Sequence, residues 1–295
     1  MDFWKYQALG NDYLVVDGRA RAPLAPDQVR RICDRHFGVG SDGILWHDAD
    51  RDELERSKSG ERARASRSEA FGLRIFNPDA SEAEKSGNGL RIFARYLFDR
   101  GLVGGDPFAV STPGGRVACR VLDGGRRVDV EMGRVSFASR DIPVVGPERD
   151  VLEEPLAIGG ETVVFSAATV GNPHCVILRE KVTAEEACRL GPLLEDHTAL
   201  FPNRTNVQFV QVWNPREIQI EIWERGAGYT LASGSSSCAA AAVAHRLGLV
   251  GPEITVHMRG GDLEVSLDAK MHARQVGPVR AVATGAIAAE LLEGT

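Results

Sequence analysis

Two serines stand at equivalent places in the two halves of the chain, and each could belong to a ligand-binding site. Ser86-Gly87 and Ser233-Gly234 lie 147 residues apart, and helix-forming residues follow each pair. A serine oxygen can cap a helix, and the adjoining glycine lets a ligand approach the backbone. The N–H groups and dipole of a helix N-terminus favour an anion such as a carboxylate. Two such sites on opposite faces of one ligand would suit the transfer of a proton across a carbon atom.

The similarity between the halves extends beyond these pairs. Three pairs of segments match in order: 8–17 (ALGNDYLVVD) with 169–178 (TVGNPHCVIL), 73–80 (LRIFNPDA) with 220–227 (IEIWERGA), and 85–104 with 232–251. The first pair has an offset of 161 residues and the others 147, so the first half contains an insertion of 14 residues. We place it in the charged segment 47–68, which we expect to be an exposed loop or hairpin tip.

Each half predicts the order strand, Gly-Asn turn, strand, polar turn, Ser-Gly, helix. Segment 116–133 has two alternating runs about an Asp-Gly-Gly turn and indicates a hairpin. Further strands are expected at 205–213 and 218–223, and helices at 26–37, 89–100, 184–197 and 236–248. These elements favour an α+β fold of two pseudo-symmetric lobes, each a curved mixed sheet or barrel around a central helix. We expect an N-terminal lobe of residues 1–115 with the tail 276–295, a C-terminal lobe of residues 116–275, and an active site in the cleft between them.

The composition and charge indicate which class of protein this is and which partners it is not expected to bind. A chain of 295 residues with 43% hydrophobic and 26% charged residues is typical of a globular protein with two domains. Its formal net charge of -6 gives no electrostatic reason to expect nucleic acid or an anionic membrane as a partner. We expect no secretory signal and no membrane span. The five cysteines lack metal-ligand spacing, so we expect reduced thiols in a cytoplasmic protein and no metal.

Four segments carry a more specific signal: SEAEKSGNGLR, GNPHC, RTNVQFVQ and ERGAGYTLASGSSSCAAAA. They closely resemble motifs of the diaminopimelate epimerase family, in the same order, and the resemblance spans almost the whole chain. It implies two lobes of one topology, no cofactor, and inversion at the α-carbon of an amino acid by two opposed groups. It also implies an isomerase of lysine biosynthesis that acts on a small amino acid, diaminopimelate by default. We expect a homodimer.

The chain departs from the family at the two proton carriers. The family has cysteines where this sequence has Ser86 and Ser233. A thiol with a pKa near ~8.5 forms a thiolate readily at a helix N-terminus, whereas a serine hydroxyl needs an adjacent base. Lys85 and Tyr229 also replace the usual methionine and glutamate, so we interpret the serines as features of a natural, divergent member.

The resemblance also assigns the remaining site residues. His174 and Glu224 would lie near Ser86 and Ser233 and orient or deprotonate them, which makes these four the catalytic candidates. The far amino-acid end of the substrate would bind Asn11, Asn77, Asn172, Asn206 and Arg225. The carboxylate at the reacting carbon would bind Gly87, Asn88, Gly234 and Ser235. Cys175 and Cys238 are not expected to replace the family's thiols.

Three functions remain open on the sequence alone. The first is a cofactor-independent amino-acid epimerase or racemase. The second is an isomerase or lyase on the same scaffold, with Glu224 as a carboxylate base. The third is a ligand-binding paralogue without catalysis. Taken singly, each site residue also has a structural explanation, since asparagine is frequent in turns and an exposed Glu-Arg pair contributes little energy. Exchange of the substrate α-proton in deuterium oxide would distinguish the three functions.

Overall fold

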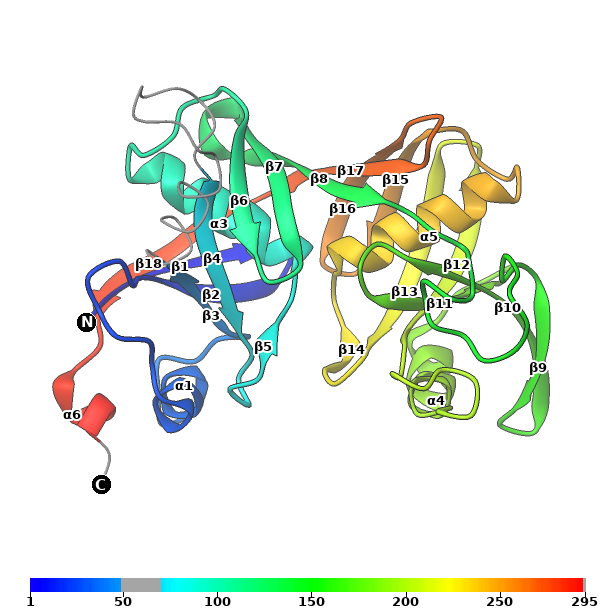
Figure 1. Cartoon of the computed structure of the whole chain (residues 1–295), viewed down its shortest axis with the longest axis horizontal. Helices are drawn as coiled ribbons and strands as arrows, with labels where there is room; N and C mark the ends of the chain where they lie inside the picture. The colour runs from blue at the N-terminus through cyan, green and yellow to red at the C-terminus, as the bar shows by residue number, and fades with distance from the viewer. Residues whose placement is uncertain (49–69, 294–295) are drawn as a thin grey trace. The chain divides into compact units, whose positions relative to one another are not determined.

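A computed structural model of the chain describes residues 1–48 and 70–293 (Figure 1). The charged insertion expected at 47–68 lies almost entirely outside the described residues. The chain divides into a first unit, Met1–Val130 with Gly277–Thr295, and a second unit, Glu131–Val276. Within the described residues, every helix falls short of the length and hydropathy that a membrane crossing requires.

The first unit contains one mixed sheet. Its strands are β1 (Asp2–Ala8), β2 (Asn11–Asp17), β3 (Ile44–His47), β4 (Ala70–Phe76), β5 (Glu82–Ala83), β6 (Phe108–Thr112), β7 (Gly115–Leu122), the first part of β8 (Arg127–Arg134), and β18 (Arg280–Ala286). β1 pairs with β18 and β2, and from β2 the sheet continues through β3, β4, β6 and β7 to β8. The helices are α1 (Pro26–Cys33), α3 (Gly87–Asp99) and α6 (Ala289–Glu293), and a 3-10 turn, η1 (Asp123–Gly125), joins β7 to β8.

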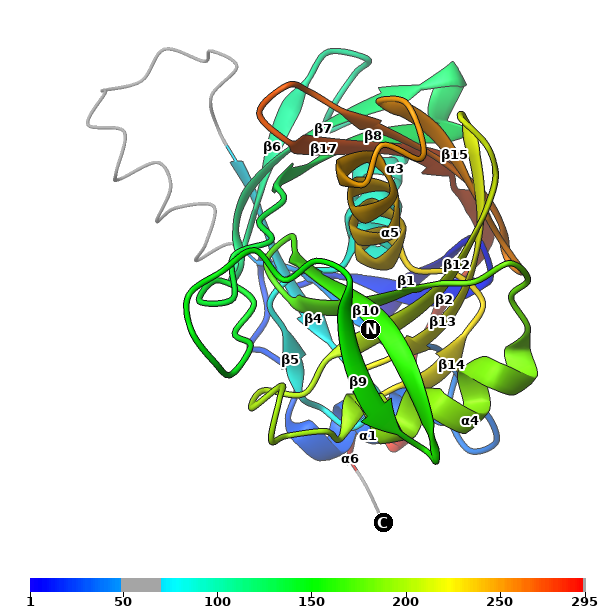
Figure 2. The same ribbon diagram turned by 90° about the vertical axis from the view of Figure 1, so that its right-hand side faces the viewer.

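The second unit contains a sheet of the same design. Its strands are β9 (Glu154–Ile158), β10 (Glu161–Thr169), β11 (Pro173–Leu178), β12 (Asn206–Asn214), β13 (Glu217–Glu224), β14 (Gly228–Thr230), β15 (Glu253–Met258), β16 (Gly261–Leu267) and most of β17 (His272–Pro278). Its helices are α4 (Ala184–Glu195) and α5 (Gly234–Arg246). In Figure 2, strands of this unit curve around α5, which packs against β10, β11, β12, β13, β15 and β16.

The two sheets repeat the same pairings. From β1 to β8 the successive contacts are antiparallel, parallel, antiparallel, parallel, antiparallel and antiparallel, and the same series runs from β10 to β17 through β13 and β15. A shift of 147 residues carries Gly87–Asp99 onto Gly234–Arg246 without any change of length. The predicted fold class, two pseudo-symmetric α+β lobes with a curved sheet and a central helix, is therefore confirmed.

The central helices begin directly after the two serines, as the Ser-Gly pairs predicted. α3 begins at Gly87 and α5 at Gly234, two residues before the helical segments 89–100 and 236–248 that the sequence pattern indicated. The serine before each glycine has extended backbone angles and its oxygen accepts a backbone N–H of the first turn. The serine cap therefore sets the helix start, and the glycine after it, which sequence patterns treat as a helix breaker, becomes the first helical residue.

The division between the units lies later than the 115/116 boundary that the sequence suggested. The Asp-Gly-Gly turn forms the expected hairpin, with Gly124 and Gly125 at φ of 64° and 94°. Residues 115–119 of β7 pair with β6, so this hairpin extends the first sheet. Residues 116–130 consequently belong to the first unit, and the chain passes to the second within β8.

Helix α4 covers one face of the second sheet and shapes the end of β13. Ala187, Leu190 and Leu194 on this helix are buried in an apolar cluster that Trp223 of β13 also contacts. Gly191 faces that indole so closely that an added Cβ would lie 2.5 Å from Cγ of Trp223. The helix and the last residues of β13 are thus held in direct contact.

Replacing Gly191 by alanine tests this contact. In a helix interior, glycine to alanine ordinarily stabilises a protein by ~1 kcal/mol. Because the new methyl group would overlap Trp223, we expect Gly191→Ala to lower the free energy of unfolding by about 1–3 kcal/mol in urea denaturation. Gly104→Ala is the control, since a Cβ at that position meets nothing within 4 Å. A Gly191→Ala protein at least as stable as the wild type would contradict the packing described here.

Candidate active site

The start of α3 is built by Ser86 and the glycines that follow it. Ser86 has φ -138° and ψ 121°, and its Oγ accepts a hydrogen bond from the Gly89 backbone N–H at 3.0 Å. Gly87 and Asn88, the first two helical residues, are buried. A serine hydroxyl can accept this bond and still donate its own proton, so Ser86 can act as a cap and contact a ligand at the same time.

The start of α5 has the same geometry, and its serine is more deeply buried. Ser233 has φ -144° and ψ 126° and is 4% exposed. Its Oγ accepts from the Ser236 N–H at 3.4 Å, a longer bond than at Ser86. A Cβ on Gly234 would lie 2.4 Å from Oε1 of Gln275, so a larger residue there would require the Gln275 side chain to move. Ser235, by contrast, is only partly buried.

A chain of side-chain hydrogen bonds fixes the amides of the first unit. The buried guanidinium of Arg91 donates to Asn88 Oδ1 at 2.6 Å, Asn88 Nδ2 donates to Asn11 Oδ1 at 3.2 Å, and Asn11 Nδ2 donates to Asp42 Oδ2 at 2.8 Å. Arg91 and Asp42 at the two ends therefore determine which way both amides point. Amide nitrogens are hydrogen-bond donors, and such donors suit a ligand with acceptor oxygens.

Asn77 lies in the turn after β4 and bonds within that turn. Its Nδ2 donates to Ser81 Oγ at 2.9 Å, and its backbone N–H donates to the Ser81 carbonyl at 2.9 Å. Ser81 in turn donates to Asp79 Oδ1 at 2.6 Å. Asn77 is thus positioned by its own turn, apart from the bonded chain of Asn11 and Asn88.

The second unit has different polar groups, which lie around the buried His174. His174 is fully buried, and its Nε2 lies 3.0 Å from Asn172 Oδ1. Burial lowers the pKa of His174 to about 3, partly offset by the neighbouring Gln208 side chain. Gln208 Nε2 donates to Ser236 Oγ at 3.1 Å in the first turn of α5. His174 is therefore neutral at physiological pH. Within the described residues its Nδ1 and the Oε1 of Gln208 have no hydrogen-bond partner, so the Gln208–Ser236 bond is separate from the Asn172–His174 contact.

The turn after β13 carries Glu224 and Arg225. Asn206, which is 5% exposed, accepts the Arg225 backbone N–H on Oδ1 at 3.0 Å and donates from Nδ2 to the Pro173 carbonyl at 2.8 Å. The Arg225 side chain is exposed and donates to the Asn203 carbonyl at 2.9 Å. Glu224 is partly buried at the end of β13. Asn206 thus joins the start of β11 to this turn.

Each unit therefore gathers part of the predicted site. Asn11 and Asn88 meet beside the start of α3, and Asn172, His174, Asn206 and Arg225 gather around the ends of β11 and β13. Sequence reasoning missed Asp42, Arg91 and Gln208, which orient these groups. Two of them had a signal: Arg91 follows Asn88 by three residues on a helix, and Gln208 follows Asn206 by two on a strand, so each pair shares a face.

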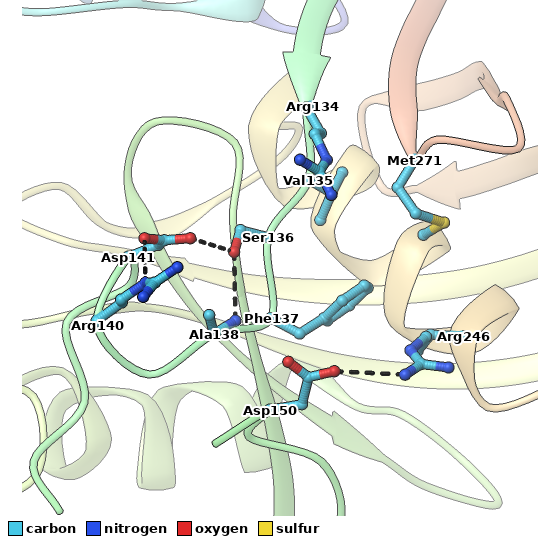
Figure 3. A pocket seen from close by; sticks show the side chains of 10 residues that line it. All are labelled: Arg134, Val135, Ser136, Phe137, Ala138, Arg140, Asp141, Asp150, Arg246 and Met271. Carbon is cyan, nitrogen blue, oxygen red and sulfur yellow. Dashed lines mark hydrogen bonds and ion pairs between the residues drawn. The ribbon is translucent and has the colours of Figure 1, made fainter. Parts of the chain in front are cut away.

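A separate cavity of about 540 Å³ lies in the second unit (Figure 3). Its polar side chains bond to one another: Arg246 to Asp150 at 3.3 Å, and Ser136 Oγ to Asp141 Oδ2 at 2.6 Å. The residues that line it are Arg134, Val135, Ser136, Phe137, Ala138, Arg140, Asp141, Asp150, Arg246 and Met271. None of the predicted site residues is among them, so the cavity does not mark the candidate active site.

Comparisons with known proteins place these motifs in a family. A family model described as diaminopimelate epimerase matches residues 3–138 and 166–282. Diaminopimelate epimerase 2 of a Nostoc species is 51% identical over 292 residues, which cover 99% of this chain and 97% of that protein. The diaminopimelate epimerase of Pelotomaculum thermopropionicum is 40% identical over 291 residues, covering 97% and 98%.

Solved structures show the same fold at low sequence identity. A probable proline racemase from Agrobacterium radiobacter has a TM-score of 0.70 at 14% identity, covering 98% of this chain and 93% of that chain. A phenazine biosynthesis protein from Bacillus anthracis has a TM-score of 0.63 at 15% identity, covering 97% and 98%. At such identities the likeness concerns the fold alone.

The depressed pKa of His174 has a consequence for stability. Its ordinary value is 6.5 and its folded value is about 3, so the unfolded chain binds the proton more tightly. Stability is therefore lost as the pH falls from 6.5 towards 3, by about 2 kcal/mol at pH 5 for this one group. We expect the loss in unfolding free energy between pH 7 and pH 5, measured with urea, to be smaller by that amount in His174→Gln.

The control is the exposed His36, and His36→Gln should keep the wild-type pH dependence. Equal losses of stability in His174→Gln and wild type would show that His174 titrates normally in the folded protein.

Proposed function

The chain belongs to the diaminopimelate epimerase family, and from this premise we propose that it inverts an α-carbon of diaminopimelate in lysine biosynthesis. As a member of that family it is an isomerase, a cofactor-independent amino-acid epimerase. One observation supports the choice of substrate chemistry above all: both units present a serine-capped helix that starts with glycine, with hydrogen-bonding side chains beside it.

In this proposal the two helix starts act on the same α-carbon. The substrate carboxylate accepts hydrogen bonds from the helix starts at Gly87, Asn88, Gly234 and Ser235, which stabilise the negative charge that develops when the α-proton leaves. Ser86 and Ser233 contact the two faces, one hydroxyl relaying the proton away and the other returning it. Inversion follows because removal and return occur on opposite faces.

The far amino-acid end of the substrate binds the amides and the guanidinium. We assign this role to Asn11, Asn77, Asn172, Asn206 and Arg225. The fixed amide orientations in the first unit favour a carboxylate there, and Arg225 supplies a charge that can pair with one in two parallel hydrogen bonds.

A serine hydroxyl that transfers a proton needs an adjacent base, and His174 and Glu224 are not equally suited to that role. A histidine whose conjugate acid has a pKa of about 3 is a poor proton acceptor. Glu224 is partly buried at the end of β13, and a carboxylate is the stronger general base of the two. We therefore assign the base to Glu224, and assign to His174 the orientation of Asn172.

The position of Glu224, partly buried at the end of β13, also favours a second function. If Glu224 removes the α-proton directly, the protein is an isomerase with a carboxylate base, and the serines serve only as helix caps. The substrate would then be an unsaturated acid, and the product would be its isomer with the carbon–carbon double bond shifted, instead of an amino acid with an inverted α-carbon.

Proton exchange in deuterium oxide tests the assignment of the serines. We expect the wild type to exchange and invert the α-position of diaminopimelate, with NMR and chiral chromatography as readouts. Ser86→Ala and Ser233→Ala should each lower the exchange rate by about 100-fold or more, the usual loss for a proton-transfer group, and change substrate affinity little.

Thr183→Ala is the matched control, because Thr183 caps α4 by accepting the Glu186 N–H at 3.2 Å. It should lose a cap worth ~1 kcal/mol of stability and keep full exchange. Exchange that persists in both serine variants but disappears in Glu224→Gln would support the carboxylate-base isomerase in place of the epimerase.

We also propose that the protein is a cytoplasmic homodimer that assembles through β18. All seven residues of this strand are exposed, and Val282 is 56% exposed. β18 pairs with β1, and its sequence RAVATGA has one charged residue. An exposed strand of this kind is a ready template for another strand, and a second copy would cover it.

Light scattering after size exclusion should report twice the monomer mass of 31.9 kDa. Val282→Lys places a charge on the strand and should shift the mass towards the monomer. Val164→Lys is the control, because Val164 is 50% exposed on β10 in the second unit. A monomeric wild type, or a Val282→Lys variant that stays dimeric, would refute assembly through β18.

A further inference from the structure

We propose that Glu195, the last residue of α4, is a positioning residue for the turn that carries Glu224 and Arg225. The proposal rests on the function proposed above for those two residues. Glu195 belongs to none of the motifs that define the site, and it acts through the backbone of the turn rather than on the substrate.

Three donors from three segments converge on this carboxylate, which is 4% exposed. Oε2 accepts the indole N–H of Trp223 at 2.6 Å. Oε1 accepts the backbone N–H of Gly226 at 2.7 Å and lies 2.5 Å from Nη2 of Arg204. Both oxygens are therefore used, and the orientation of the carboxylate is fixed.

A carboxylate so deeply buried persists only when it is paired and hydrogen-bonded. Arg204 supplies the charge, and it also bonds Asp196 at 2.8 Å, so it is itself held in place. The donors from Trp223 and Gly226 then fix the end of β13 and the first glycine of the turn to the end of α4.

Two successive backbone N–H groups of this turn donate hydrogen bonds to side chains that lie outside it. The Arg225 N–H donates to Asn206 Oδ1, and the Gly226 N–H donates to Glu195. Gly226 adopts φ +78°, and the Ala227 N–H closes the turn on the Glu224 carbonyl at 3.1 Å. The backbone of Glu224 and Arg225 is therefore held by Asn206 on one side and by Glu195 on the other.

The equivalent turn of the first unit is held in another way. There Asp79 accepts the N–H and hydroxyl of Ser81 within the turn, and Arg30 of α1 donates to the Asp79 carbonyl at 3.2 Å. The same fold thus forms this turn without a buried carboxylate from the covering helix. The arrangement around Glu195 is specific to the unit that carries Glu224 and Arg225, which points to their positioning rather than to the fold.

Glu195→Gln tests the proposal because glutamine offers one acceptor and one donor group in place of two acceptors. It cannot accept from both Trp223 and Gly226, so one N–H must lose its partner. We expect kcat/KM for diaminopimelate to fall by about 100-fold, through a higher KM from displaced Arg225 and a lower kcat from displaced Glu224. The matched control is Glu161→Gln, whose carboxylate pairs with Arg189 of the same helix at the surface and whose loss should leave both constants unchanged.

A second substitution separates positioning from general destabilisation. Trp223→Phe removes one of the two competing donors, so in the Glu195→Gln background the glutamine can turn its oxygen to Gly226. We expect the double variant to recover about 10-fold or more in kcat/KM relative to Glu195→Gln, a gain that further loss of packing could not produce. Wild-type kinetics in Glu195→Gln, or a double variant worse than Glu195→Gln, would overturn the proposal.

A measurement without substrate keeps this test apart from the proposed function. In NMR spectra, the indole N–H resonance of Trp223 or the hydrogen-exchange protection of the Gly226 amide should change in Glu195→Gln and remain in Glu161→Gln. If wild type fails to act on diaminopimelate while this change is seen, the substrate is wrong and the anchoring of the turn stands. If neither signal changes, the turn does not depend on Glu195.

Discussion

The first turn of a buried helix is the constraint on which the rest of this structure depends. In α3 and in α5, ten of the thirteen residues are buried, so the N–H groups that open each helix have little access to water. Such groups must find partners. Ser86 and Ser233 each satisfy one of them. In the proposed reaction, the substrate carboxylate would accept hydrogen bonds at these same helix starts, so the requirement that shapes the helices would also shape the binding site.

The same constraint bears on the exchange of cysteine for serine. A serine oxygen is a good helix cap, and sulfur is a weaker acceptor, so the serines strengthen the helix starts. They also remove the groups that ionise readily near neutral pH. Burial raises the pKa of the Cys175 thiol, so this cysteine does not restore a thiolate. In the proposed function, proton transfer then depends on a neighbouring base, so the position of Glu224 would matter more than it does in a protein with two thiols.

Much of the fold was predictable, because its signals are local and occur twice. The Ser-Gly pairs, the Gly-Asn turns and the Asp-Gly-Gly hairpin each act over a few residues, and the internal repeat supports the first two with a second copy. The boundary between the units was harder to predict. A hairpin pattern indicates that β7 and β8 pair with each other, but it does not indicate which sheet they extend.

The site residues that the sequence did not reveal are far along the chain from the groups that they bind. Asp42 lies 31 residues from Asn11, and Glu195 lies 31 residues from Gly226. A carboxylate on a helix or in a loop has the same sequence signature whether it faces solvent or accepts buried N–H groups. Only the folded chain shows that these two carboxylates are fixed points for the groups around them.

The repeat explains why the two units share a backbone while their side chains differ. The first unit holds its amides between the guanidinium of Arg91 and the carboxylate of Asp42, whereas the second uses the neutral His174 and Gln208. An epimerisation runs in both directions, so proton transfer needs equivalent groups on both faces of the carbon, and matching helix starts can supply them. An amino-acid substrate has one reacting end and one distal end, so its recognition needs unequal groups. Duplicated backbone with divergent side chains meets both requirements, and the anchoring of the β13 turn by Glu195 is one further difference of the same kind.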